Sequence, residues 1–76
     1  RNVPARLAKQ LGVLAGTGGA AAVAIGQGEL AQMLGVSREI ITRQLGIWQE
    51  AGLVELGRGR IVLHDRVRLE RIVAGE

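Results

Sequence analysis

The chain has 76 residues, a formal net charge of +3 and an apolar fraction of 47%, which allows one small domain with its own core. It has no cysteine, which excludes a disulfide framework and a thiolate zinc site, and its single histidine, His64, has no expected partner for metal binding or acid–base work. The longest apolar stretch, residues 18–26, is too short to span a bilayer, and no signal peptide opens the chain. We therefore expect a soluble protein, and the lack of cysteine is consistent with a cytoplasmic one.

The first third of the chain predicts a helix followed by a short strand. Apolar residues recur at helical spacing over residues 3–14, which indicates an amphipathic helix. Its apolar stripe contains Val3, Leu7, Leu11 and Leu14, and its polar side contains Arg6, Lys9 and Gln10. The glycine-rich residues 16–19 end this helix. Small and β-branched residues follow at 20–25, where Val23 and Ile25 alternate, so a strand is favoured over a helical tail.

Residues 27–45 predict two short helices joined by a tight turn. Such a pair needs a small residue where the helices cross, a glycine that can adopt a positive φ in the turn, and a cap for the second helix. Ala31, Gly35 and Ser37 supply these in that order. The helices are expected at 27–34 and 38–51, with burial of Leu30, Ala31 and Leu34 in the first and of Ile41, Leu45 and Trp48 in the second. This layout is typical of a helix-turn-helix that reads DNA.

The second helix of this pair ends at Gly52, and apolar strands are predicted at 53–56 and 60–63. The residues between them, 57–59, have the composition of a three-residue hairpin loop in which glycine adopts a positive φ. Inside the helix, Gly46 costs roughly 1 kcal/mol relative to alanine. It either permits a close approach of another segment or is simply tolerated.

A last helix is predicted over 65–73, with Asp65 as its cap. Its apolar residues available for burial are Val67, Leu69, Ile72 and Val73. The order helix, strand, helix, turn, helix, hairpin is that of a winged helix. The expected fold class is therefore α+β, mainly α, in a single domain over 1–76 with its helix-turn-helix at 27–45 and its wing at 53–63. Trp48 is expected in the core, and His64 on the surface at a strand end.

Four polar side chains share the outward face of the 38–51 helix. Arg38 and Thr42 are separated by four residues, as are Glu39 and Arg43, so all four lie opposite the apolar stripe. In the major groove arginine bonds guanine O6 and N7, glutamate accepts from cytosine N4, and threonine contacts the thymine methyl; a good bidentate pair is worth about 1–3 kcal/mol. We expect these residues to contact bases in half-sites with a G·C pair flanked by T·A. The alternative is a solvated Glu39–Arg43 ion pair worth under about 1 kcal/mol.

Other side chains near this helix are candidates for contacts with the DNA backbone. Gln27 opens the preceding helix, Ser37 can share its capping hydroxyl with a phosphate, and Arg58 and Arg60 flank the wing tip. A charged hairpin tip also helps to keep any protein soluble. Between residues 27 and 60 four arginines are balanced by four glutamates. The placement of the charges, and not their sum, must therefore account for DNA binding.

Four segments carry a resemblance to a known family: GVSRE at 35–39, TRQL at 42–45, EAGLV at 50–54 and GRGRI at 57–61. With them the chain resembles, from Val3 to about Leu69, the DNA-binding domain of the cyclic-AMP receptor protein and Fnr (Crp/Fnr) family of bacterial transcription regulators. The resemblance implies base contacts by Arg38, Glu39 and Arg43, as in cyclic-AMP-responsive members, and by Glu39, Thr42 and Arg43, as in Fnr-like ones. Family members often carry threonine or serine where this chain has Ile40, so one backbone contact is lost there or the position packs against another surface.

The resemblance also implies what lies outside this chain. Members of the family have an N-terminal β-roll effector domain and a long dimerisation helix, so we expect an excised C-terminal domain with no cofactor of its own. An effector such as a cyclic nucleotide would bind the missing domain. The full-length protein would be a homodimer on a near-palindromic operator in double-stranded DNA, with RNA polymerase as a further partner and no membrane association. The isolated domain would be monomeric and would bind weakly.

A function of another class, protein–protein interaction, is the main alternative. A winged helix can serve protein–protein interaction, with the 38–51 helix or the wing against a partner protein. The polar outward face favours DNA, because protein-binding surfaces more often expose aromatic or aliphatic anchors. Catalysis is not expected, since no nucleophile with a base, carboxylate pair or phosphate-binding loop can be assembled. Nothing in the sequence indicates a ligand pocket within this domain.

Overall fold

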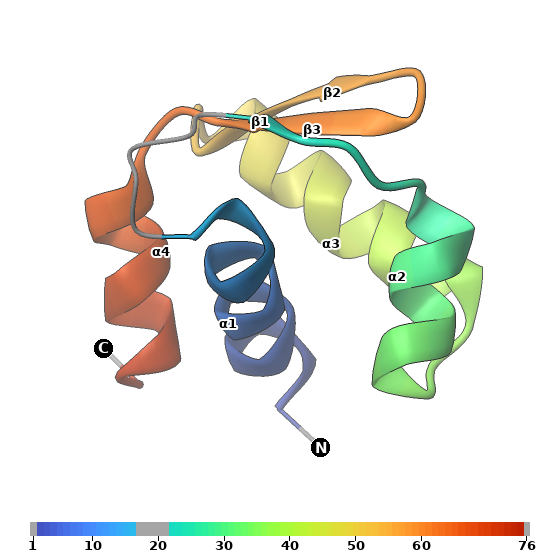
Figure 1. The fold of residues 1–76 in the computed structure, drawn as a ribbon. Helices are drawn as coiled ribbons and strands as arrows, with labels where there is room; N and C mark the ends of the chain where they lie inside the picture. Colours follow the sequence, from blue (N-terminus) through green and yellow to red (C-terminus); the bar gives the residue numbers. More distant parts are fainter. Residues whose placement is uncertain (1, 17–21, 76) are drawn as a thin grey trace.

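The structure, a computed structural model, describes residues 2–16 and 22–75 (Figure 1). Its elements in chain order are α1 (Val3–Ala15), β1 (Ala22–Val23), α2 (Gln27–Leu34), α3 (Arg38–Glu50), β2 (Val54–Gly57), β3 (Arg60–Leu63) and α4 (Arg66–Val73). The strands form one antiparallel sheet in the order β1-β3-β2. Four helices and a small sheet with a hairpin make a winged helix-turn-helix over the described residues, as predicted.

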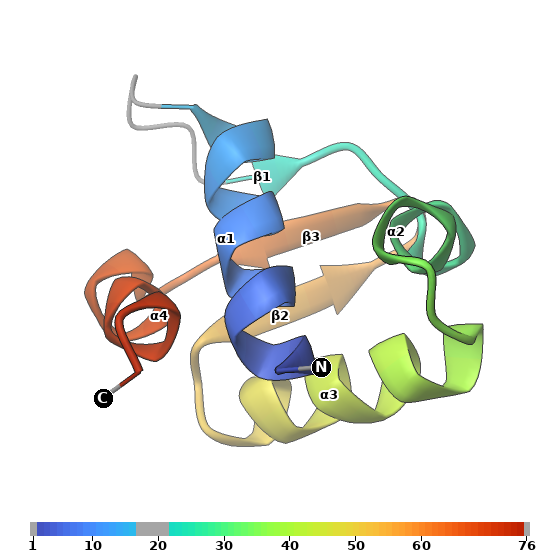
Figure 2. The same ribbon diagram turned by 90° about the horizontal axis from the view of Figure 1, so that it is seen from below.

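The core lies between the sheet and the helices. α1 runs across one face of the sheet, with α4 on one side of it and α2 on the other, and α3 crosses below the hairpin (Figures 1 and 2). The largest fully buried side chains are Leu7, Leu11, Leu30, Ile41, Leu45, Val54 and Ile61. Among the described residues no polar or charged side chain is buried. Apolar packing contributed by all four helices and the sheet therefore holds the domain together.

The helix-turn-helix has nearly the predicted bounds. α2 spans Gln27–Leu34 as expected, and α3 ends at Glu50, one residue early, with Ala51 as its C-cap. All six residues expected to be buried in this pair of helices are buried. Gly35 adopts the left-handed conformation at φ 70°, and the Ser37 hydroxyl accepts a 3.4 Å hydrogen bond from the Ile40 amide. The turn residue and the cap are thus confirmed, and Ala31 is buried.

The predicted inward face of α1 is partly wrong. The buried residues are Leu7, Ala8, Leu11 and Ala15, whereas Leu14 is exposed. The buried stripe is rotated because α4 packs against the Ala8 side of α1. Of the described residues in the strand predicted at 20–25, only Ala22 and Val23 form β1, in which they pair with Val62 and Ile61 of β3. Residues 20 and 21 lie outside the described residues, as do 17–19 of the predicted glycine-rich break, while Gly16 caps α1 with φ 76°.

The hairpin loop is shorter than predicted. Gly57 pairs with Arg60 across the strands, so the loop has two residues, Arg58 and Gly59, and only Gly59 of these has a positive φ, at 67°. The first strand begins at Val54, since the Leu53 amide instead bonds the Trp48 carbonyl at the end of α3. The predicted loop length is wrong because the composition of residues 57–59 does not show that Gly57 still pairs with the opposite strand.

α4 begins after its predicted cap, since the Asp65 carboxylate accepts a 3.0 Å hydrogen bond from the Arg68 amide. Of its four apolar candidates only Leu69 is buried, Ile72 packs against the core, and Val67 and Val73 are exposed. That part of the prediction is wrong because only one side of α4 meets α1 and the core.

Three single-residue expectations have clear outcomes. Trp48 is buried and His64 is exposed, as predicted for both. The expectation that His64 has no partner is wrong, because its ring nitrogen lies 2.9 Å from the Glu55 carboxylate. A side chain at Gly46 would meet no atom within 4 Å, so no close approach requires this glycine. Gly46 is a tolerated helix residue.

Candidate nucleic-acid interface

Arg38, Glu39, Thr42 and Arg43 come together on the outward face of α3. All four are exposed, and together they line an open hollow of about 400 Å³ that no other described residue lines. We call this the polar hollow. Its lining consists of two guanidinium groups, one carboxylate and one hydroxyl-bearing side chain, which together offer donors, an acceptor and a methyl group to a ligand. The structure therefore groups the four side chains that the helical spacing predicted to share a face.

The polar hollow stands on a helix with fixed packing. On the opposite side of α3, Ile41, Leu45 and Trp48 are buried in the core. The Ser37 cap satisfies one of the free amides at the start of the helix. Because the helix cannot rotate without exposing the buried residues, the direction of its polar face is set by the core.

A second hollow lies beside the first, between the wing tip and the start of α2. It has a volume of about 210 Å³ and is lined by Ile25, Gly26, Gln27, Arg38, Gly57, Arg58, Gly59, Arg60 and Ile61. We call it the wing hollow. Three of its side chains are arginines and none is acidic, so the local charge is positive although the 27–60 segment is formally neutral. Arg38 lines both hollows and makes them one continuous surface.

The N-terminus of α2 opens onto the wing hollow through Gly26 and Gln27. Gly26 is the N-cap and makes no side-chain capping bond, so the first amides of the helix lack that partner. Free amides at a helix N-terminus carry partial positive charge and bind anions. The wing hollow thus combines three guanidinium groups with a helix end that also favours an anion.

Gln27 has a role that the sequence did not indicate. Its side-chain oxygen accepts a 2.6 Å hydrogen bond from the Thr42 hydroxyl, which joins the first residue of α2 to the middle of the polar face of α3. The two residues are 15 positions apart, and no periodic pattern relates them. Gln27 was predicted only as a contact for the DNA backbone.

Two further polar contacts hold the surrounding elements in place, and both were missed in the sequence. The Gln49 side-chain oxygen on α3 accepts a 2.8 Å hydrogen bond from the Leu56 amide in the wing. The Arg6 guanidinium on α1 donates to the Leu34 carbonyl at the C-terminus of α2. The first contact fixes the wing to α3, and the second ties the helix-turn-helix to α1.

The family model described as a Crp-like helix-turn-helix domain matches residues 5–72 of the sequence. The chain belongs to this family. The Crp/Fnr membership predicted from its four sequence segments is thereby confirmed. A search of curated proteins returned no significant match.

Solved structures of the same kind resemble the Crp-like domain over nearly its whole length. A protein assigned as a transcriptional regulator of the Crp/Fnr family from Eubacterium rectale is 36% identical, with 95% of this chain and 33% of that one covered and a TM-score of 0.88. The Thermus thermophilus catabolite activator protein is 35% identical, with 97% and 33% covered and a TM-score of 0.75. A second Thermus thermophilus protein, a transcriptional regulator of the Crp family, is 26% identical, with 95% and 40% covered and a TM-score of 0.85.

The Crp-like domain spans 33–40% of the length of these three structures. The family model and these neighbours together identify it as a DNA-binding domain of the transcription-regulator class, and the neighbours are regulators rather than enzymes. Its described helices include none that is long and apolar enough to cross a membrane.

The acidic residues of the Crp-like domain are placed mostly away from its two hollows. Glu55 pairs with His64, while Glu29 and Glu50 line neither hollow. Glu39 alone belongs to the polar hollow, where it can act as a hydrogen-bond acceptor. This arrangement accounts for a positive surface on a segment whose charges sum to zero.

Ser37 and Ile40 lie at the start of α3 beside the polar hollow, but neither lines it. Ser37 is exposed, and its hydroxyl makes the capping bond already described. Ile40 is 45% exposed, so it does not serve as a packing residue within the described domain. Isoleucine at this position has no hydroxyl group to donate or accept a hydrogen bond.

Proposed function

We propose that this domain binds double-stranded DNA in a sequence-specific manner, with α3 in the major groove and the wing against the sugar-phosphate backbone. The observation that carries the proposal is the junction of two hollows at Arg38. One is lined only by side chains that can contact base edges, and the other is rich in arginine and has a helix N-terminus. DNA presents base edges and phosphates side by side in the same way.

Each side chain of the polar hollow has a partner among the base edges. Arg38 and Arg43 are suited to guanine O6 and N7, Glu39 to cytosine N4, and Thr42 to the thymine methyl. Because Glu39 and Arg43 lie one turn apart on α3, they can contact the two bases of one G·C pair. The expected half-site is therefore a G·C pair with a T·A pair beside it.

The wing hollow supplies the contacts that position the protein without reading sequence. Arg58 and Arg60 flank the wing tip, and Gln27 lies at the end of α2 that favours anions. Ser37 is a candidate for one more phosphate contact, since its hydroxyl is exposed at the N-terminus of α3. These four residues are our proposed backbone contacts.

The size of the domain agrees with a dimeric complex. Its principal extents are 28 × 27 × 22 Å, and successive major grooves on one side of DNA are about 34 Å apart, so two copies can lie next to each other on a near-palindromic site. We propose that residues 1–76 form the C-terminal domain of a longer, homodimeric regulator. In that protein the effector would bind outside this domain, and RNA polymerase would be a further partner.

A protein-interaction role is the second candidate, and one observation favours it. Ile40 and Ile47 on α3 are 45% and 54% exposed and, being seven residues apart, lie on the same side of the helix. Aliphatic side chains of this kind can anchor a partner protein. They occupy a strip beside the polar hollow and do not line it.

The test is an anisotropy titration at low salt against a randomised duplex pool, followed by sequencing of the bound fraction. We expect enrichment of a short half-site that contains guanine. Arg43→Ala should reduce the preference for that guanine over other bases roughly 5- to 150-fold, equivalent to about 1–3 kcal/mol. Arg58→Ala should weaken binding to every duplex alike and reduce the salt slope by about 1.

Arg71→Ala is the matched control, because it removes the same charge from α4 and Arg71 lines neither the polar hollow nor the wing hollow. It should leave the sequence preference intact. Equal effects of Arg43→Ala and Arg58→Ala on all duplexes would contradict the proposal. If no sequence is enriched, the result would favour the second candidate function, in which Ile40 and Ile47 contact a partner protein.

A further inference from the structure

The hydrogen bond between Gln27 and Thr42 connects the two hollows. Gln27 lines the wing hollow, Thr42 lines the polar hollow, and the Thr42 hydroxyl donates to the Gln27 side-chain oxygen at 2.6 Å. It is the one direct side-chain bond between α2 and α3 among the described residues. A ligand in either hollow can therefore contact a side chain that is hydrogen-bonded to a side chain of the other hollow.

The bond determines which part of Thr42 is available to a ligand. A helical threonine divides its population between two χ1 rotamers, because its hydroxyl can turn back to a carbonyl three or four residues earlier in the same helix. For Thr42 those carbonyls belong to Glu39 and Arg38. In the structure the hydroxyl is directed at α2 instead, and its proton is used there. The γ-methyl group is then the part of this exposed side chain left for contact.

The same bond leaves Gln27 with unused donors. The side-chain oxygen is occupied by Thr42, whereas the amide nitrogen carries two hydrogens that can reach a phosphate at the arginine-rich wing hollow. One side chain can thus contact the backbone and orient a base-reading residue at the same time.

We propose that Gln27 is a positioning residue that presents the Thr42 methyl group to the DNA, and that the domain thereby recognises the 5-methyl group of a thymine. This inference rests on the proposed sequence-specific binding of DNA. To the thymine contact already proposed for Thr42, it adds the residue outside α3 that orients this side chain. An apolar contact with the thymine methyl is a known mode of base discrimination in the major groove.

The experiment uses the enriched duplex with each thymine replaced in turn by uracil, which removes only the methyl group. At one thymine in each half-site the wild-type domain should lose about fourfold in affinity, the effect expected for one buried methyl group. Thr42→Ser keeps the hydroxyl but lacks the methyl, so it should bind thymine and uracil duplexes equally. Thr42→Val loses the bond to Gln27, but valine has a methyl group on both branches of Cβ, one of them in place of the hydroxyl. In the threonine rotamer a methyl group therefore remains at the contact, and the variant should retain the preference for thymine.

Substitutions of Gln27 test the positioning role. Gln27→Met has similar length but no hydrogen-bonding group, so it should lose much of the thymine preference. Gln27→Glu keeps the acceptor for the Thr42 hydroxyl, so it should retain that preference while binding all duplexes more weakly, because it loses the amide donor and adds a negative charge. Gln32→Met is the matched control: Gln32 is exposed on α2, and its side chain makes no hydrogen bond within the described part of the domain.

A second readout needs no DNA. Three-bond scalar couplings of Thr42, measured by NMR, report its χ1 rotamer in the free domain. We expect a single rotamer in the wild type, in Gln27→Glu and in Gln32→Met, and a changed or averaged one in Gln27→Met, with thermal unfolding used to confirm that each variant is folded. A change in stability alone would not produce this pattern.

The possible failures are distinguishable. Absence of any enriched duplex would contradict the proposed function itself. An enriched duplex whose uracil penalty is the same for the wild type and Thr42→Ser would overturn the assignment of the methyl contact to Thr42. An unchanged rotamer and an unchanged uracil penalty in Gln27→Met would overturn the role of Gln27.

Discussion

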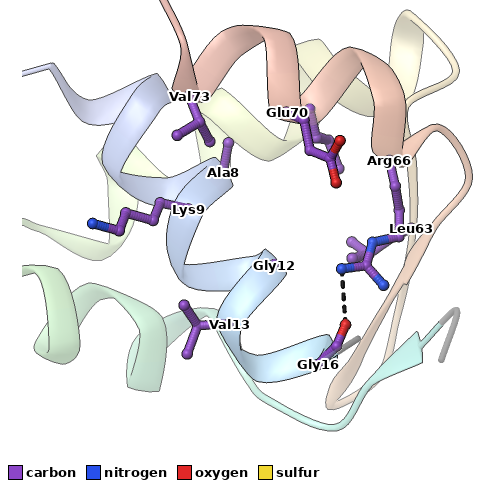
Figure 3. Close-up of a pocket in the computed structure, with 10 residues that line it drawn as sticks. Ala8, Lys9, Gly12, Val13, Gly16, Leu63, Arg66, Glu70 and Val73 are labelled. Atoms are coloured by element: carbon purple, nitrogen blue, oxygen red, sulfur yellow. Dashed lines mark hydrogen bonds between the residues drawn. The ribbon is translucent and has the colours of Figure 1, made fainter. Parts of the chain in front are cut away.

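Two surface hollows of nearly equal volume are lined by different types of residue. The polar hollow on α3 has about 400 Å³, and a groove between α1 and α4 has about 420 Å³. The α1–α4 groove is lined by Ala8, Lys9, Gly12, Val13, Gly16, Leu63, Arg66, Leu69, Glu70 and Val73 (Figure 3). Most of this lining is apolar, and the two hollows have no residue in common. Volume therefore does not distinguish the proposed nucleic-acid surface from a gap between packed helices, whereas the residue types of the lining do.

The polar hollow and the α1–α4 groove also have different physical origins. The α1–α4 groove exists because α1 turns the small residues Ala8 and Gly12 toward α4, which leaves space between the helices. Arg66 closes one end of it by donating to the Gly16 carbonyl at 2.9 Å, as the dashed line in Figure 3 shows. The polar hollow arises instead from long side chains that project from a helix packed firmly on its other side. Every side chain that lines the polar hollow carries a hydrogen-bonding group, whereas the α1–α4 groove has only Lys9, Arg66 and Glu70 of this kind among its ten lining residues.

The largest expected effect tests whether the polar hollow depends on the packing beneath it. Ile41→Ala removes a fully buried side chain from the core side of α3, and it should lower the free energy of unfolding by about 2–5 kcal/mol. Ile40→Ala removes the same group from an exposed position one residue away, and it should change that free energy by no more than about 0.5 kcal/mol. Urea denaturation followed by circular dichroism measures both, and equal losses would show that the inward and outward sides of α3 are not distinct.

An intermediate effect separates the two roles of Ser37. Ser37→Ala removes the cap of α3 and should cost about 1 kcal/mol in the free energy of unfolding. Ser37→Asp keeps a capping acceptor and should retain stability, yet its negative charge should weaken binding to DNA if a phosphate lies beside it. Thermal unfolding and anisotropy titration measure the two properties. Wild-type affinity in Ser37→Asp would remove Ser37 from the proposed backbone contacts.

The smallest expected effect concerns the α1–α4 groove. Val13 is 64% exposed on its rim, so Val13→Ser should change the free energy of unfolding by no more than about 0.5 kcal/mol and leave the affinity for DNA unchanged. Arg43→Ala, measured in the same anisotropy titration, supplies the contrasting result from the polar hollow. A loss of DNA affinity in Val13→Ser would show that the α1–α4 groove influences DNA binding. It would contradict the separation of the groove from the polar hollow.

The sequence predicted the fold best where its signals were local. Gly35, Ser37 and the apolar spacing of the two helices fixed the bounds of α2 and placed the start of α3 correctly. The predicted faces of α1 and α4 were less accurate, with Leu14 and Val67 exposed, because periodicity shows that a helix has an apolar side but not which neighbour covers each part of it. The sequence shows the composition of a hairpin loop but not which of its glycines stays paired.

The candidate site shows the same limit. The residues of the polar hollow were found because they lie one turn apart on a single helix, where spacing determines a shared face. The bonds from Gln27 to Thr42 and from Arg6 to Leu34 connect residues 15 and 28 positions apart. Their geometry depends on how the helices cross, so it required the tertiary structure.

The bond from Gln49 to Leu56 has a consequence for the form of the DNA. This bond ties the wing to α3, the helix proposed to enter the major groove, and so constrains the distance between α3 and the wing tip before any duplex binds. A duplex that meets both must then adjust its own groove width and curvature to that distance. The energy of this adjustment depends on base steps that no side chain contacts. Sequences just outside the half-site should consequently influence affinity through the flexibility of the double helix.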